Sequence, residues 1–516
     1  MTEDSQPQPS EVFATDRPSP APDPWRAPAS LWVWLVLLLA TFAVPQISDW
    51  EGRGAKIAKQ STAGAAPTAS MPELLQAEYL TRLALSPIFS GQSTQGALSG
   101  GNAKSLADAA TDAYRTIAVE KKGVLAARKV LVLEHLQKKP LDNAFLTGVL
   151  ASNLSGRGEK AGPIGSEIAL WRSLYGKNAA RDFDRANTDL AVKRVRALDL
   201  GLLEKQALTD VYRLAGRDAD ADRTRKSLQD KITSDVTRLI LVILLLGVGA
   251  LAGIAFLVLF AVAWAGKKWN LVGRIRREPV AVFAKVDLPS ALPFGSLLDV
   301  FVAYLALSRG MGLIAGIIPG LESVSDVYLS AGVYVGSGGI AALYGLSRAR
   351  AERWDLPRLG MRTAGLRDVL YGVAGYCAAL PVLFTLAALN NAFFKKTESA
   401  LAPNPVLPMI AGEGSEIGRV VLFCLVAIAA PIVEELFFRG VLYSALKARF
   451  STALAVILSA ACFAVAHPMG DWLPIFGLGC VLATVRELRQ SLIPGIVLHF
   501  LQNAVAFTMM SSLFGK

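Results

Sequence analysis

Two adjacent carboxylates and an arginine lie inside an apolar stretch near the C-terminal end of the chain. The segment APIVEELFFRGVLY, residues 430–443, is largely apolar but contains Glu434, Glu435 and Arg439. Charged side chains at the centre of a membrane helix cost about 2.5–3.5 kcal/mol each on insertion scales, so they are functional candidates by default. In a helix, Glu435 and Arg439 share a face and can pair, whereas Glu434 points about 100 degrees away from Glu435. The arginine is therefore expected to hold Glu435 and to leave Glu434 free for chemistry.

Two histidines and an asparagine lie on other apolar segments of the same region. His467 follows Phe463 by four residues in CFAVAHP, and His499 and Asn503 share one helical face in VLHFLQNAV. The chain has three histidines in total, and these are two of them. A carboxylate, two imidazoles and a carboxamide supply a base to activate water, a proton shuttle and donors to an oxyanion. These residue types are the ones that hydrolysis needs.

Membrane-spanning helices are the elements that must position these side chains. The chain of 516 residues is 53% hydrophobic and 18% charged. Apolar runs of about 18 or more residues are candidates for membrane spans. The two shortest candidates, 452–467 and 471–485, are expected to be tilted, partly buried or re-entrant. The sequence predicts eight spans, at 238–265, 296–318, 327–346, 367–389, 417–443, 452–467, 471–485 and 491–513.

A ninth apolar segment, residues 31–44, lies near the N-terminus. A long, Pro-rich and acidic stretch precedes it, and no clean small-residue cleavage site follows it. These features argue against a cleaved signal peptide. We therefore expect an uncleaved signal-anchor helix over residues 31–47.

The net charge of +11 follows a pattern that indicates orientation in a membrane. Lys and Arg residues cluster in alternate loops, around Arg276, Arg353, Lys447 and Arg486, while the loops between them hold few. The positive-inside rule places the basic loops in the cytoplasm. The N-terminus is then cytoplasmic, and residues 51–235 and the C-terminus lie outside. This placement argues against a nucleic-acid partner.

The region 51–235 is expected to be a helical domain. It opens with the flexible linker composition STAGAAPTAS, and Ile117, Val124 and Leu131 recur at near-helical spacing. An irregular helical domain is favoured over a repeat array. This domain is a candidate binding site for a protein partner. The predicted division is a disordered cytoplasmic tail (1–30), the signal anchor (31–47), the extracytoplasmic domain (51–235), a transmembrane helix with a basic cytoplasmic loop (236–290) and a membrane domain (291–516).

Three motifs of the last spans resemble those of a known family. EELFFR fits EExxxR, FAVAH fits FxxxH and HFLQN fits HxxxN, in that order. The chain thus resembles the CPBP family, the type II CAAX prenyl endopeptidases and their bacterial relatives linked to bacteriocin processing, also called the ABI domain. The resemblance covers roughly residues 290–516. It implies an all-α polytopic membrane protein with an eight-helix intramembrane protease core, to which the anchor helix and the helical extracytoplasmic domain are added.

The resemblance also implies roles for single residues. Glu434 would activate water with the assistance of His467, and His499 and Asn503 would stabilise the oxyanion. The supporting residues would be Glu435, Arg439 and Phe463. The implied activity is that of a membrane endopeptidase acting on a membrane-associated protein or peptide. The alanine-rich chain is typical of a bacterial inner-membrane protein, so a prenylated substrate is not assumed.

A zinc mechanism is the alternative to a metal-free one. Glu434, His467 and His499 are then the ligands, since open catalytic zinc sites use three such groups. The sequence lacks HExxH, and the favoured mechanism requires no cofactor. Neither a disulfide nor a cysteine metal site is expected, because the cysteines lie inside predicted spans without paired ligand spacing. They are Cys377, Cys424, Cys462 and Cys480.

Two alternative functions remain open at this point. A non-catalytic family member would act as a scaffold or as a bacteriocin-immunity-type protein. A proton-coupled transporter would use the same carboxylates and histidines as a relay, although no paired inverted repeats are evident. The depth of His467 is also open. If 452–467 crosses outward, His467 lies near its outer end and away from Glu434, unless the short segments are re-entrant.

Overall fold

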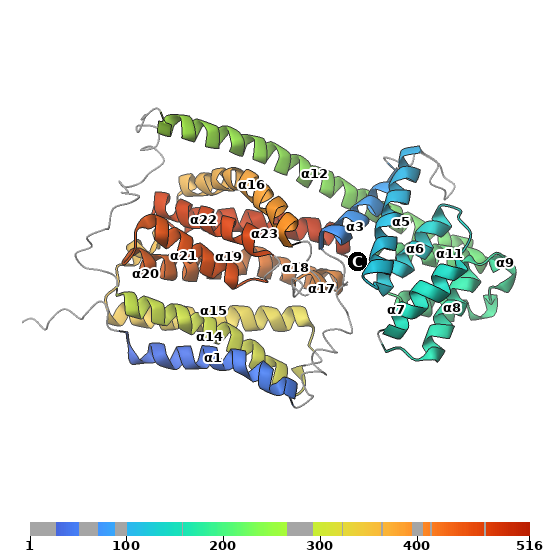
Figure 1. Cartoon of the computed structure of the whole chain (residues 1–516), viewed down its shortest axis with the longest axis horizontal. Coiled ribbons are helices and arrows are strands. Elements are labelled where there is room, and N and C mark those ends of the chain that lie inside the picture. Colours follow the sequence, from blue (N-terminus) through green and yellow to red (C-terminus); the bar gives the residue numbers. More distant parts are fainter. Residues whose placement is uncertain are drawn as a thin grey trace, which may run out of the picture.

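Helices are the only regular elements of the described part of the chain. The computed structural model describes residues 27–50, 71–87, 101–265, 293–394 and 406–515, apart from residues 157, 322, 323, 363, 364, 413, 414, 469 and 470. Long helices form one bundle, and shorter helices form a second bundle beside it (Figure 1). Residues 1–26 of the expected tail, the linker STAGAAPTAS and the expected basic loop after residue 265 lie outside the described residues.

Six helices of the long bundle are long and apolar enough to cross a membrane. They confirm the prediction of an all-α polytopic membrane protein. The segment 31–44 belongs to α1, Ala29–Trp50, which packs on α14, with Trp34 5.7 Å from Tyr344 of α15. The six are α12 (Asp218–Ala265), α14 (Phe294–Ile317), α15 (Asp326–Ala351), α16 (Leu366–Phe394), the segment Glu416–Lys447 and α23 (Ile493–Phe514).

The two short candidates do form helices, but they are not among those six. α21, Thr452–Val465, has 14 residues, and α22, Trp472–Arg489, has 18. At 1.5 Å per residue, α21 is about 21 Å long, which is shorter than a hydrocarbon core of about 30 Å. His467 follows a helix that is too short to cross, and Phe463 near its end packs 5.1 Å from Phe438. α21 therefore ends beside the helix that carries Glu434, and His467 does not lie away from that helix as a full outward crossing would require.

The segment 416–447 differs from the single regular helix expected over 417–443. Two stretches in it have the wider π-helical turn, η6 (Cys424–Ala429) and η7 (Glu435–Leu442). Pro431 follows η6 and has no N–H to continue the hydrogen-bond ladder. π-Helical turns occur mostly as local bulges and frequently at functional sites. The remaining parts are α18 (Glu416–Phe423), α19 (Ala430–Glu434) and α20 (Tyr443–Lys447).

The second bundle has its own apolar core, in which Tyr114, Ile117, Leu131 and Trp171 are buried. The third histidine of the chain, His135, lies in this bundle. Its ring is half-buried and stacks on Tyr175 at 4.1 Å. The helices are α3 (Met71–Leu85), α5 (Gly101–Glu120), α6 (Val124–Leu136), η1 (Phe145–Leu150), α7 (Ala151–Gly156), α8 (Ala161–Tyr175), α9 (Ala179–Asp182), η2 (Arg185–Asn187), α10 (Thr188–Ala197) and α11 (Leu202–Leu214).

α12 belongs to both bundles. Its 48 residues run without a break from the second bundle along the long one (Figure 1). The first half packs on α11, and the second half packs on α16, where a Cβ at Gly253 would lie 1.9 Å from the Cys377 carbonyl oxygen. At the other end of the chain, Phe514 of α23 packs against the core of the second bundle. The second bundle and the end of α23 therefore lie on the same side of the long bundle.

Two short elements complete the long bundle. η4, Leu356–Leu359, lies between α15 and α16, and the buried Arg486 of α22 donates to the Arg358 carbonyl there at 2.6 Å. α17, Val406–Gly412, packs on α23 beside α18. The four cysteines are free.

Candidate functional site

Glu435 and Arg439 form the buried pair that their spacing predicts. Arg439 Nη1 donates to Glu435 Oε1 at 2.9 Å, and both side chains are fully buried. The guanidinium also lies 4.2 Å from the centre of the Phe463 ring, a cation–π contact. The second oxygen, Glu435 Oε2, faces Gly495, where an added Cβ would lie only 2.7 Å away. α23 can therefore approach the pair closely only because residue 495 has no side chain.

Glu434 has no part in this pair and faces a different helix. The Tyr334 hydroxyl of α15 donates to Glu434 Oε1 at 3.0 Å. The Glu434 side chain is 14% exposed, whereas its neighbour Glu435 is not exposed at all. The helices come close because a Cβ at Gly338 would lie 3.0 Å from the side chain of Val433. One carboxylate is thus fixed by an arginine, and the adjacent one is held by a neutral hydroxyl.

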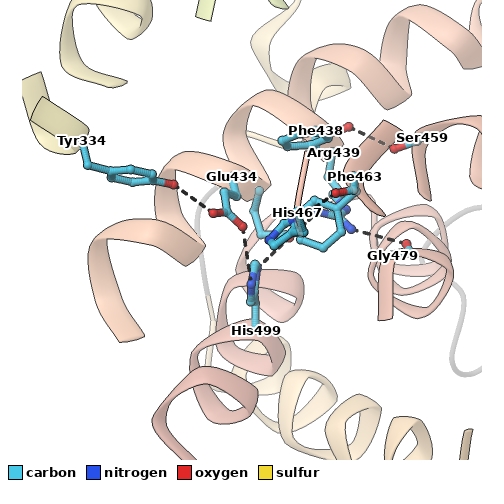
Figure 2. A network of polar contacts seen from close by, with 10 residues as sticks. Tyr334, Glu434, Phe438, Arg439, Ser459, Phe463, His467, Gly479 and His499 are labelled. Atoms are coloured by element: carbon cyan, nitrogen blue, oxygen red, sulfur yellow. Dashed lines mark hydrogen bonds and ion pairs between the residues drawn. The ribbon is translucent and has the colours of Figure 1, made fainter. Parts of the chain in front are cut away.

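His499 lies between the two carboxylates. Its Nδ1 is 3.2 Å from Glu435 Oε1, and its Nε2 is 3.6 Å from Glu434 Oε2. The Nδ1 contact is a hydrogen bond, whereas 3.6 Å is beyond hydrogen-bond reach. Figure 2 shows Tyr334, Glu434 and His499 joined in a row by dashed lines.

His467 lies beside this row and contacts it through Phe463. The Phe463 ring is 4.7 Å from the His467 ring and 5.7 Å from the His499 ring (Figure 2). His467 Nδ1 lies 2.8 Å from the Phe463 carbonyl oxygen, which can only accept. Nδ1 is therefore the donor, and Nε2 is left available for another partner. Trp472 donates to the His467 carbonyl at 2.9 Å and holds the turn after α21.

Asn503 makes a contact that its spacing from His499 did not predict. Its Nδ2 donates to the Val426 carbonyl of η6 at 2.9 Å. In η6 the Ala430 N–H bonds to Leu425, five residues before it, so the next bond of the series would join Pro431 to Val426. Proline has no N–H to give, and the Asn503 amide takes its place. One of the two Nδ2 protons of Asn503 therefore serves the helix backbone, and the other remains for a second acceptor.

Part of the chain is similar to a known protein family. Residues 416–505 match the family described as type II CAAX prenyl endopeptidase Rce1-like. We refer to residues 416–505 as the Rce1-like domain after the family that they match. The match confirms the resemblance drawn from the three motifs. No curated protein and no solved structure matches the chain.

The Rce1-like domain contains every site residue expected from the sequence. The match extends from α18 to the greater part of α23, less than a fifth of the chain. The structure brings Glu434, Glu435 and His499 into direct contact, and places Phe463 and His467 beside them. Asn503 lies on the same helix as His499, but its recorded bond is to Val426.

Tyr334 lies outside the Rce1-like domain, and the sequence did not single it out. It is 100 residues before its partner Glu434 in the chain. The same helix also carries Tyr328 and Tyr344, so a tyrosine in this apolar segment gave no distinct signal. The packing of α15 on α19 determines that Tyr334 is the one of these three tyrosines that bonds to Glu434.

The donors expected for zinc do not gather into a metal site. Among the residues that the structure describes, no group of three or more His, Cys, Asp or Glu side chains is placed to hold a metal ion. The Phe463 ring contacts both His467 and His499, and His499 Nδ1 is engaged by Glu435. The alternative ligand set Glu434, His467 and His499 is therefore not found as a preformed cluster among the described residues.

Proposed function

We propose that this chain is an intramembrane endopeptidase that hydrolyses a peptide bond of a membrane-associated protein or peptide. The proposal rests on the partners and the exposure of the Glu434 carboxylate. Arg439 is taken by Glu435, so the Glu434 carboxylate has no guanidinium partner and keeps some exposure, at 14%. A carboxylate in this setting can act as a general base, because no guanidinium holds its lone pairs.

In the proposed reaction, Glu434 accepts a proton from a water molecule while the water oxygen attacks the scissile carbonyl. His467 assists through Nε2, which its Nδ1 bond to Phe463 leaves free. The oxyanion receives a hydrogen bond from His499 Nε2–H and one from the second N–H of Asn503. Glu434 then delivers its proton to the leaving nitrogen as the C–N bond breaks. Glu435 and Arg439 hold His499 in place from its Nδ1 side.

The arrangement also supports a proposal on orientation. The second bundle and the end of α23 lie on one side of the long bundle, which agrees with charge patterning that places both outside the cytoplasm. We place the N-terminus in the cytoplasm of a bacterial cell and the chain in its inner membrane. The second bundle is then an extracytoplasmic domain, suited to binding a protein partner or substrate above the membrane.

A cleavage assay tests the proposed activity. Purified protein in detergent is incubated with a set of membrane-segment peptides, and products are identified by mass spectrometry. The wild type is expected to cleave at least one peptide, and Glu434→Ala to lose at least about a hundredfold in rate, the usual contribution of a general base. The control is Glu416→Ala, an exposed carboxylate at the start of α18.

The other outcomes separate the alternatives. Full activity in Glu434→Ala overturns the proposed mechanism. Absence of cleavage by the wild type, together with solute uptake that Glu434→Ala abolishes, favours a transporter. Exhaustive chelation is expected to leave cleavage unchanged, and a loss that added zinc restores would favour the metal mechanism.

A further inference from the structure

Arg439 follows Glu434 by five residues in the chain. If Glu434 is to act as a base, its carboxylate must not pair with this guanidinium. Arg439 lies within the same π-helical turn as Glu435 and is fully buried. Its Nε has no hydrogen-bond partner among the described residues, so the guanidinium retains capacity for a second carboxylate. A buried anion gains from any cation it can reach. A contact that holds the Glu434 side chain on the side away from Arg439 therefore preserves it as a base.

Tyr334 supplies that restraint. Its hydroxyl is the hydrogen-bond donor recorded for Glu434, and it reaches Oε1 from α15, a helix outside the Rce1-like domain. The bond leaves Oε2 directed toward His499, at 3.6 Å from Nε2 (Figure 2). The two oxygens of one carboxylate thus have separate partners, and Oε2 is the oxygen that no hydroxyl holds.

The position of Tyr334 is itself fixed by packing. Gly338 lies one helical turn after Tyr334, and its missing side chain admits Val433, the residue before Glu434. On the other side, Tyr304 of α14 lies close enough to interact with Tyr334. Tyr304 is buried and stacks on Phe437 with ring centres 4.1 Å apart. Two neighbouring helices therefore hold the tyrosine that contacts the catalytic candidate.

We propose that Tyr334 is a positioning residue for the hydrolytic reaction, which holds the Glu434 carboxylate away from Arg439 and aims Oε2 at the water. This role rests on the proposed function. The residue acts through Glu434 and needs no contact with the substrate. Its loss therefore affects the rate of the chemical step and leaves binding of the peptide almost unchanged.

Tyr334→Phe removes the hydroxyl and keeps the ring. We expect kcat to fall roughly 10- to 100-fold, the worth of one hydrogen bond to a charged group, with KM changed less than about twofold. Tyr328→Phe is the matched control on the same helix, because Tyr328 is exposed and lies six residues before Tyr334, and its kcat should equal that of the wild type. Tyr344→Phe removes a hydroxyl bonded to the buried Asp299 at 2.5 Å, so it should lower the melting temperature and spare kcat per folded molecule.

Infrared spectroscopy provides a readout that does not depend on turnover. The carboxylate band that disappears in Glu434→Gln is assigned to Glu434, and Tyr334→Phe should shift it while Tyr328→Phe should not. An unshifted band, an unchanged kcat or a loss confined to KM overturns the positioning role alone. A wild type that cleaves no peptide overturns the proposed function, and the role of Tyr334 with it.

Discussion

At the scale of single residues, the site separates two adjacent carboxylates into different environments. The sequence predicted the Glu435–Arg439 pair because both partners are local and their spacing fixes the contact. It did not predict that Tyr334 holds Glu434, because that partner is 100 residues away and depends on how two helices pack. It also did not predict that His499 contacts both carboxylates. Local partners can be predicted from spacing, whereas partners across helices cannot.

The buried pair makes a prediction about stability. Arg439→Met leaves the Glu435 charge buried without its cation, and we expect it to destabilise the protein by about 3–5 kcal/mol. The double variant Glu435→Gln/Arg439→Met should cost less than the sum of the single variants, because no unpaired charge remains. Melting in detergent measures both. Arg367→Met, at an exposed position of α16, is the control. Strictly additive losses would show that the two side chains do not act as a pair.

At the scale of elements, the departures from a regular helix are what the sequence could least predict. The boundaries of α15, α16 and α23 lie within a few residues of the expected spans, except that α15 and α16 extend about five residues further at their C-terminal ends. The π-helical stretches η6 and η7 were not expected, since hydropathy does not distinguish one helical turn from another. Pro431 was the available signal, because it interrupts the hydrogen-bond ladder at the second residue of α19, two residues after the end of η6.

The bond from Asn503 to Val426 is the element-scale prediction. Asn503→Leu leaves the Val426 carbonyl without its donor, and we expect a loss of about 1–3 kcal/mol. The same change should cost clearly less in a Pro431→Ala background, because residue 431 then has an N–H to offer. A double-mutant cycle followed by thermal melting measures the difference. An equal cost in both backgrounds would mean that Asn503 does not replace the missing proline donor.

At the scale of the whole molecule, α12 joins the second bundle to the membrane helices. The sequence of residues 227–237 contains neither Pro nor Gly, which favours an unbroken helix. It did not predict the buried charges that fix the helix to its neighbours. Asp235 of α12 lies 3.7 Å from Arg82 of α3, which also pairs with Glu78 at 2.7 Å, and Lys129 of α6 bonds to the same glutamate. These ionic contacts tie α12 to the second bundle.

The second bundle also contains a carboxylic acid, Asp210, whose pKa is raised by burial. Asp210 accepts hydrogen bonds from Tyr175 at 3.2 Å and Gln206 at 3.0 Å, and burial raises the pKa of Asp210 to about 7 against the opposing effect of Arg213. The folded chain then binds a proton that the unfolded chain releases above its ordinary pKa of 3.8. The stability from this group is full below that value and is lost as the pH rises to about 7. His135, stacked on Tyr175, acts in the opposite direction because burial lowers its pKa.

Asp210→Asn tests this account of pH dependence. Between about pH 4 and pH 7 the melting temperature of the variant should fall less than that of the wild type, because residue 210 then has no group that titrates. Calorimetry of the full chain at several pH values measures the transition of the second bundle. Asp222→Asn, at an exposed position of α12, should leave the profile unchanged. A wild-type profile retained in Asp210→Asn would assign the dependence to another group.

The central claim is that Glu434 activates water for peptide hydrolysis, and cleavage in water enriched in heavy oxygen tests it most directly. Wild type and Glu434→Gln, which keeps the shape of the side chain and an acceptor for Tyr334, are incubated with the same peptide. We predict that wild-type cleavage places the heavy oxygen in the new carboxylate of the N-terminal fragment, and that Glu434→Gln releases almost no fragment while melting like the wild type. Fragments released by Glu434→Gln at the wild-type rate, or fragments without the label, would contradict the claim.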